Sequence, residues 1–425
     1  MDLRKDAWFI INTALGKVMP DQAVERALRG KSFGTGKVYL TAVGKAAWQM
    51  ARTAAAILGD RLEAGICVTK YGHVKGEIPG ILCLEAGHPI PDENSFAGTQ
   101  AVLDMVGSLT KEDTVVFLLS GGGSALFEKP LLPGEELADI TAQLLAGGAD
   151  IAEINTIRKR LSAVKGGRFA KICAPARVYS IVLSDVLGDP LDLIASGPAY
   201  PDSSTCEQAL AVAEKYELRL SRQATDLLKR NTPEKLYNVD TVVTGSVRNL
   251  CLAAAEACEK LGYRPVILTD QLCCEAREAG SFLASIAKTH QDTKESLAFL
   301  AGGETVVHLT GKGLGGRNQE LALAAAAGIS GLKDTAVFSI GSDGTDGPTD
   351  AAGGFCDGGT EGRLRSGGIE IARVLRDNNA YMALEAADGL IKTGPTGTNV
   401  NDVAVLLIKR DSEPENGKDS YEPIF

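Results

Sequence analysis

Short apolar runs rich in β-branched residues alternate along the chain with longer alanine- and leucine-rich stretches. The short runs have the length and composition of buried strands, and the longer stretches have the period of amphipathic helices. Strands that alternate with helices imply crossover connections and a largely parallel sheet. In the first half of the chain, the pattern predicts strands at residues 37–43, 65–69, 80–85, 114–119 and 178–183.

A polar helical region at residues 207–230 interrupts this pattern, which then restarts. We therefore expect a domain boundary near residue 235, with an N-terminal domain at 1–235 and a C-terminal domain at 236–425. The run at 305–310 alternates and has no helix before it, so antiparallel pairing and a mixed second sheet are expected. The strands predicted in the second half lie at residues 240–243, 265–269, 296–300, 305–310, 336–340 and 403–409.

These elements predict an α/β protein of two domains. The N-terminal domain is expected to have a Rossmann-like, mostly parallel sheet, and the smaller C-terminal domain a mixed sheet. Glycine supplies 48 of the 425 residues and gathers at the ends of the predicted strands. Ligands of open α/β sheets collect at the carboxyl ends of the strands, where glycine lets backbone amides approach them. The sequence thus predicts an anion-binding active site in a cleft between the domains.

Composition excludes several classes of function. The net charge is −10 and the chain has no basic tail, which argues against a nucleic-acid partner. The nine cysteines include no Cys-x-x-Cys pair, so neither a zinc site nor a disulfide framework is expected. The N-terminal apolar run indicates an amphipathic helix rather than a signal peptide, and no apolar stretch reaches about 18 residues. We expect a cytoplasmic protein with small-molecule partners and no membrane partner.

Two candidate anion-binding elements follow strands of the first half. The loop Gly121, Gly122, Gly123 and Ser124 comes directly after a strongly apolar strand, and its amides can form a cradle for a phosphate or carboxylate. Lys45 opens a helix at another strand end, where the helix dipole favours anions. A solvated position remains the alternative for this lysine.

A basic segment at residues 155–168 and the acidic loop after the fifth strand add further candidates. Lys165 precedes two glycines and either contacts ligand or lies on a solvated helix face, whereas Lys159 and Arg160 are interpreted as solvated. Asp185 and Asp189 can hold Mg²⁺ or accept a hydroxyl proton, and the alternative for Asp185 is a turn cap.

Three features of the second half carry chemistry. Arg317 and Asn318 open a helix beside four glycines, where an arginine can stabilise a transferring phosphoryl group. Asp343 lies in a loop that is either a cation site or an Asx-rich turn. Residues 311–316 match the dinucleotide fingerprint G-x-G-x-x-G, with Asp343 placed for a ribose, so a nicotinamide enzyme remains an alternative. His88 lies between prolines in a loop and is interpreted as structural.

Eight motifs in order along nearly the whole chain resemble the type II glycerate kinases, which join an N-terminal glycerate-kinase domain to a C-terminal MOFRL domain. The motifs are VGKAA at 43–47, LLSGGGSAL at 118–126, NTIRKRLSAVKGGR from Asn155, SDVLGDPLDLIASGP from Ser184, GGETVV from Gly302, GKGLGGRNQE from Gly311, SDGTDGPTDAAG from Ser342 and TGPTGTNVND from Thr393.

This resemblance implies that the protein is a glycerate 2-kinase that phosphorylates D-glycerate with ATP and Mg²⁺ and forms 2-phosphoglycerate. It implies Lys45 and Arg317 as the central catalytic pair and Asp189 as a ligand contact. We expect Asp189 or a nearby acid to act in catalysis by orienting the hydroxyl, and the acids Asp185 and Asp343, each at a strand end, to be metal ligands. The residues expected to contact substrate or ATP are Gly121, Gly122, Gly123, Ser124, Lys165, Ser196, Glu304, Asn318, Thr398 and Asn399.

Two other functions stay open on the sequence. A nicotinamide-dependent hydroxypyruvate reductase would use the fingerprint at 311–316, and a sugar-phosphate sensor would bind ligand without catalysis. A homodimer is compatible with the sequence, which does not decide the oligomeric state.

Overall fold

A computed structural model of the protein describes residues 2–410. The chain forms two compact units, which do not follow the order of the sequence. The N-terminal unit consists of Gly16–Asn249 and the short segment Gly397–Asn401. The C-terminal unit consists of Leu250–Thr396, the first helix up to Leu15 and the strand that begins at Asp402.

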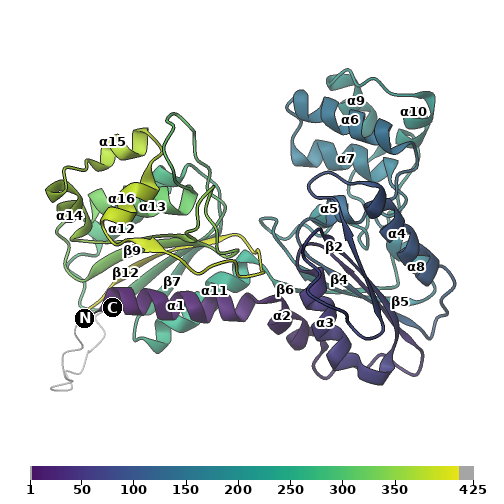
Figure 1. Ribbon diagram of the computed structural model, residues 1–425, viewed down its shortest axis with the longest axis horizontal. Helices are drawn as coiled ribbons and strands as arrows, with labels where there is room; N and C mark the ends of the chain where they lie inside the picture. The colour runs from purple at the N-terminus through teal and green to yellow at the C-terminus, as the bar shows by residue number, and fades with distance from the viewer. Residues whose placement is uncertain (1, 411–425) are drawn as a thin grey trace, which may run out of the picture. The chain divides into compact units, whose positions relative to one another are not determined.

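Six parallel strands form the sheet of the N-terminal unit, in the order β3-β2-β1-β4-β5-β6 (Figure 1). This is the strand order of a Rossmann fold. Successive strands are added outward in one direction from β1 to β3 and in the other direction from β4 to β6, so the switch point lies between β1 and β4. The predicted Rossmann-like sheet is therefore confirmed. The strands are β1 (Val38–Val43), β2 (Leu62–Lys70), β3 (Ile81–Ala86), β4 (Thr114–Leu119), β5 (Arg177–Leu183) and β6 (Val239–Gly245).

The strand β6 corrects the predicted domain boundary. It pairs in parallel with β5, so the strand predicted to open the second domain completes the first sheet. The boundary near residue 235 therefore lies too early. The sheet to which a strand belongs is decided by its pairing with strands distant in sequence, and the apolar run itself does not reveal that pairing.

Helices cover both faces of this sheet, which explains why β4 is apolar at every position. Phe117 packs with α4 and α8 on one face, and Val116 and Leu118 pack with α2 and α3 on the other. A separate layer of α6, α7, α9 and α10 has its own apolar core (Figure 1). The helices are α2 (Pro20–Leu28), α3 (Ala47–Leu58), α4 (Glu93–Val106), α5 (Gly123–Leu126), α6 (Gly134–Ala146), α7 (Ile151–Leu161), α8 (Arg168–Cys173), α9 (Cys206–Lys215) and α10 (Arg222–Leu228).

The sheet of the C-terminal unit is mixed, as predicted, with the order β11-β10-β9-β12-β8-β7. Among the described strands of this second sheet, only β7 and β8 pair in parallel. The run 305–310 forms no strand and makes a single bridge, between Val306 and Glu275, so that prediction is wrong. The strands are β7 (Arg264–Leu272), β8 (Leu297–Gly303), β9 (Thr335–Gly341), β10 (Gly353–Asp357), β11 (Leu390–Ile391) and β12 (Asp402–Ile408).

Helix α13 (Arg317–Gly328) is the central helix of the C-terminal unit and is buried on all sides from Asn318 to Ala326. It packs against α12 (Ala276–Thr289) and the sheet on one side and against α14 to α16 on the other. Figure 1 shows α1 (Leu3–Val18) and α11 (Val247–Lys260) on the opposite face of this sheet. The remaining helices are α14 (Thr360–Ser366), α15 (Ile371–Arg376) and α16 (Ala380–Ala386). Among residues 2–410, no helix is both long and apolar enough to span a bilayer.

Candidate functional site

Two of the predicted anion-binding elements meet at the switch point of the N-terminal sheet. Lys45 follows β1 and the loop Ser120–Gly123 follows β4, and these two strands are neighbours, with Val43 paired to Leu119. In open α/β sheets, the crevice outside such a pair of carboxyl ends is where ligands bind. The topology thus places a lysine and a glycine loop at the position expected of a binding site.

Hydrogen bonds between the two loops fix Lys45 beside the glycine loop. Lys45 N donates to Gly121 O at 2.8 Å, and Ala46 N donates to Ser120 Oγ at 3.1 Å. Gly44 allows this close approach, because a Cβ at that position would overlap Ser120 Oγ and Ser120 O. Its φ of 121° is also one that side chains disfavour. The loops therefore form one rigid structure.

The glycine amides and the lysine ammonium of these loops lack partners among the described residues. Within residues 2–410, the backbone N–H groups of Gly121, Gly122 and Gly123 donate to no other group, and the half-buried Lys45 ammonium pairs with no carboxylate. Buried and half-buried polar groups are normally satisfied, so this arrangement points to an anionic ligand. It is a nest of amides with an adjacent cation, which suits a phosphate or a carboxylate.

His88 belongs to this site, although its sequence context indicated a structural role. A Cβ on Gly122 would lie 3.0 Å from His88 Cδ2 and 3.2 Å from Lys45 Cε, so both side chains border the glycine loop. Burial, followed by the charges of Lys45, Lys70 and His73, lowers the pKa of His88. Its position directly after β3, at the same edge of the sheet, was the signal available in the sequence.

The acidic loop after β5 also reaches the glycine loop. A Cβ on Gly121 would overlap the carboxylate of Asp185, so this side chain lies against the predicted cradle. Asp189 has a φ of 52°, and its Oδ1 is buried with no hydrogen-bond partner among the described residues. Strained backbone and an orphaned carboxylate oxygen are features that accompany functional sites.

Lys165 and Ser196, which were predicted to contact ligand, bond to residues of the glycine loop and to its neighbours. The ammonium of Lys165 is fully buried and donates to Ser124 O at 2.8 Å and Phe127 O at 3.0 Å, the carbonyls at the end of α5. Burial lowers its pKa to about 8, and Glu128 at 3.5 Å opposes this shift. The buried hydroxyl of Ser196 donates to Asn155 Oδ1 at 2.7 Å and lies 3.3 Å from Ser124 Oγ. Both side chains support the loop.

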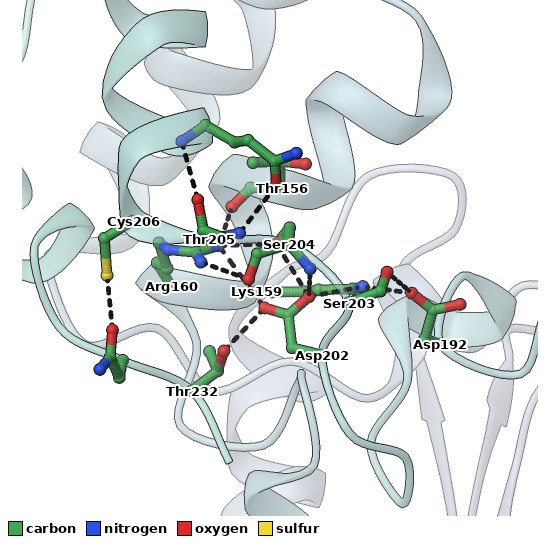
Figure 2. A network of polar contacts seen from close by, with 12 residues as sticks. Thr156, Lys159, Arg160, Asp192, Asp202, Ser203, Ser204, Thr205, Cys206 and Thr232 are labelled. Carbon is green, nitrogen blue, oxygen red and sulfur yellow. Dashed lines mark hydrogen bonds and ion pairs between the residues drawn. The ribbon is translucent and has the colours of Figure 1, made fainter. Parts of the chain in front are cut away.

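Helix α7 anchors the acidic loop through a second buried network, shown in Figure 2. Lys159 Nζ contacts Asp202 Oδ1 at 3.0 Å and Asp192 Oδ2 at 3.1 Å. Arg160 donates to Ser204 Oγ at 2.8 Å and Ser204 O at 2.9 Å. Lys159 and Arg160 are each 1% exposed, so the expectation of a solvated helix face is wrong. The segment 192–204 covers this face of α7, and helical periodicity alone does not reveal that cover.

Arg317 lies in the C-terminal unit and is neutralised by two acids. It contacts Asp402 at 2.5 and 3.0 Å and Glu304 at 2.6 Å. Glu304 was predicted to contact substrate or ATP. Burial opposes the shift, but these two carboxylates raise the pKa of Arg317. Burial in turn raises the pKa of Asp402 to about 6, even with Arg317 beside it. Asp402 was missed because it begins the apolar strand β12.

The start of α13 is already occupied by a carboxylate. Asp346 accepts from Asn318 N at 3.1 Å and from Gln319 N at 2.9 Å, and Asn318 itself is 1% exposed. Asn318, a predicted ATP contact, is therefore buried behind a capped helix end. Asp343 accepts from Thr345 N at 3.0 Å, which is the Asx turn left open by the sequence.

The remaining predicted contacts lie in the segment Gly397–Asn401 of the N-terminal unit. Thr398 is buried and its hydroxyl donates to Val18 O at 3.0 Å, and Asn399 Oδ1 accepts from Asn401 N at 3.2 Å. No group of three or more acidic, histidine or cysteine side chains among the described residues is arranged to hold a metal. Asp185 and Asp343, the predicted metal ligands, belong to different units.

Comparison with known proteins identifies the family. A family model described as "Domain of unknown function (DUF4147)" matches residues 6–229, more than half of the chain, and a model described as "MOFRL family" matches residues 297–402. The D-glycerate 2-kinase of Thermotoga maritima is 49% identical over 412 residues, which cover 96% of this chain and 98% of the relative. The chain belongs to the glycerate kinase family.

A solved structure of this family has the same fold. The glycerate kinase of Thermotoga maritima, at 49% identity, superposes with a TM-score of 0.92 and covers 96% of this chain and 100% of its own. Some relatives have a different name: two putative hydroxypyruvate reductases from Agrobacterium vitis are 38% and 36% identical over 88% and 94% of this chain and 100% and 93% of the relatives.

The glycine fingerprint that could support a reductase has another role in this member of the glycerate kinase family. The amides of its first two glycines are already bonded: Gly311 N donates to Asn378 Oδ1 at 2.8 Å, and Gly313 N donates to Asp377 O at 2.8 Å. A Cβ on either glycine would overlap the backbone of Asp377. These glycines permit close packing against the segment 377–379, and their amides are not available to a pyrophosphate.

Proposed function

We propose that this protein is a glycerate 2-kinase, which transfers the γ-phosphoryl group of ATP to D-glycerate and forms 2-phosphoglycerate. The observation that carries the chemistry is the Lys45 ammonium beside three backbone amides at the switch point of the sheet, none of which has a partner in the described part of the chain. The identity of the acceptor as glycerate comes from the family. The proposal thus combines an anion-binding site with a named substrate.

The residues of the N-terminal unit act by positioning and by electrostatics, which is what phosphoryl transfer requires of a protein. The amides of Gly121, Gly122 and Gly123 hold an anionic group of a substrate, and Lys45 stabilises the charge that develops on the transferred phosphoryl group. Asp189 orients the hydroxyl of glycerate. Arg317 remains the predicted second catalytic cation, and Asp402 and Glu304 fix its orientation.

Magnesium is expected to enter with ATP, and the acids beside the glycine loop fit that ion. Mg²⁺ is usually held by one or two carboxylates together with substrate phosphates. The carboxylate of Asp185 lies against Gly121, and Asp189 has a buried oxygen without a partner among residues 2–410. We propose Asp185 as the ligand, where the ion would offset the negative charge of the phosphates.

A coupled assay of ADP release tests the function and the role of Lys45 together. The wild type is expected to release ADP only with D-glycerate and Mg²⁺, and Lys45→Ala to lower kcat by roughly 10²–10³-fold, as for loss of one preorganised stabilising group. Lys111→Ala is the matched control, because Lys111 is 79% exposed. Turnover of Lys45→Ala equal to that of the control would refute the assignment. Phosphorus NMR of the product separates 2- from 3-phosphoglycerate.

The same assay separates the two other functions. A hydroxypyruvate reductase would oxidise NAD(P)H without ATP, and a sensor would bind ligand and release no ADP. The engaged amides of Gly311 and Gly313, the first two glycines of the fingerprint, argue against the reductase. A cytoplasmic location, a homodimer and the absence of nucleic-acid and membrane partners remain predictions, and the net charge of −10 supports the expected lack of a nucleic-acid partner.

A further inference from the structure

The side chains of His88 and Lys45 converge on one point above the glycine loop. A Cβ on Gly122 would lie 3.1 Å from His88 Nε2, 3.0 Å from His88 Cδ2 and 3.2 Å from Lys45 Cε. The ring edge that carries Nε2 therefore faces the loop whose amides are unbonded. A ligand in the amide nest would meet this nitrogen and the lysine together.

Neither ring nitrogen of His88 has a hydrogen-bond partner within the described part of the chain, although the side chain is half-buried. The neighbouring His73 contrasts with it, because His73 Nδ1 donates to Lys45 O at 2.9 Å. Polar groups removed from water are normally satisfied. A structural histidine would be expected to have a partner of the kind that His73 has, so the open nitrogens of His88 point to a ligand.

The surroundings of His88 favour its neutral form. Burial has the largest effect on its pKa, and the charges that act on it come from Lys45 after β1, Lys70 at the end of β2 and His73 in the following loop. All of them lower this pKa below the ordinary 6.5, and no carboxylate opposes them. The imidazole is thus neutral near pH 7 and has a nitrogen lone pair available as a proton acceptor.

We propose that His88 is a further catalytic residue, which accepts the proton of the glycerate hydroxyl as that oxygen attacks ATP. This inference rests on the proposed function. In the step, the O–H bond breaks and the proton passes to Nε2, while the oxygen forms a bond to the γ-phosphorus. The bond from the γ-phosphorus to the β,γ-bridging oxygen breaks, and ADP leaves with that electron pair. The imidazolium then returns its proton to water.

The variants His88→Gln and His88→Ala test this role, with His308→Gln as the control. His308 is 74% exposed in the C-terminal unit and lies outside the site. We expect His88→Gln to lower kcat by about 10²-fold or more, within the range of general-base catalysis, with little change in KM for D-glycerate. Free imidazole should restore part of the kcat of His88→Ala, which a purely structural role would not allow.

The pH profile provides the second readout. Wild-type kcat should fall in acid as His88 becomes protonated, and this limb should be absent from His88→Gln. Any limb due to Asp402, whose pKa burial raises to about 6, would be common to both proteins. Thermal unfolding of each variant verifies that it is folded.

Three results would overturn the inference. A wild-type kcat in His88→Gln would do so, as would a rise in KM with kcat unchanged, because that indicates binding alone. Loss of the acid limb in Asp189→Asn but not in His88→Gln would assign the proton to Asp189. A wild type that releases no ADP with D-glycerate would refute the proposed function itself, which the first three results leave intact.

Discussion

Replacing Asp202 by asparagine removes one negative charge from the buried network of Figure 2 and keeps the size of the side chain. Asp202 has no exposed side-chain surface and lies 3.0 Å from Lys159 Nζ and 3.5 Å from Arg160 Nη1. It also accepts from Ser204 N at 2.9 Å and from Thr232 Oγ1 at 2.9 Å. The substitution would leave two buried cations with one carboxylate, that of Asp192, which is 22% exposed.

The structure sets the size of the expected effect. At 3.0 Å, the attraction between Lys159 and Asp202 is about 5 kcal/mol with an effective dielectric constant of about 20. Removing one partner of a buried pair typically costs about 3–5 kcal/mol of unfolding free energy. Because Asp192 still pairs with Lys159, we expect Asp202→Asn to cost about 3 kcal/mol, the low end of this range. Lys159→Met in the same chain should recover part of this loss.

Urea unfolding monitored by tryptophan fluorescence measures the loss of unfolding free energy in one unit. The chain has two tryptophans, Trp8 in α1 and Trp48 in α3, so a Trp8→Phe background reports on the N-terminal unit alone. Glu63→Gln is the matched control, because its ion pair with Lys37 at 2.6 Å is 46% and 58% exposed and should contribute less than about 1 kcal/mol. An Asp202→Asn cost no larger than that of the control would refute the reasoning.

Two further predictions concern buried charges. Burial lowers the pKa of Lys165 to about 8 from 10.5, so the folded state disfavours its charged form. The unfolding free energy of the wild type relative to Lys165→Met should therefore rise with pH between 8 and 10.5, by at most about 3.4 kcal/mol; a flat difference would contradict this. Asp346→Ala should cost about 1–2 kcal/mol by uncapping α13, measured through Trp8 in a Trp48→Phe background; no loss would contradict the cap.

The strands and the glycine loops were predictable because their signals are local. Runs such as that of β4 are apolar at every position, and the turn after such a run must lie at a sheet edge. The placement of β6 was not predictable, since its own residues do not reveal that it pairs with β5. The prediction that Lys159 and Arg160 are solvated failed for a related reason: a segment more than thirty residues later in the chain covers them.

The site residues likewise differ in how far the sequence could predict their place. Lys45 and Gly121 to Gly123 follow β1 and β4, which are not consecutive in sequence but are neighbours in the strand order of a Rossmann-like sheet. The predicted fold was therefore enough to bring them together. Lys165 and Ser196 occur in motifs of the family, yet their side chains bond to Ser124 of the glycine loop. A motif identifies residues that a site requires, and it does not distinguish a residue that touches ligand from one that holds the loop in place.

The two glycine loops of this chain show which physical test makes that distinction. The fingerprint at 311–316 matches a known nucleotide pattern, but its first two glycine amides, those of Gly311 and Gly313, already donate to Asn378 and Asp377. The loop at 121–123 matches no such pattern, and its amides have no partner within residues 2–410. A glycine loop binds an anion only if its donors are unsatisfied in the folded protein. The state of the donors, rather than the spacing of the glycines, therefore supports the proposed anion site beside Lys45 and His88.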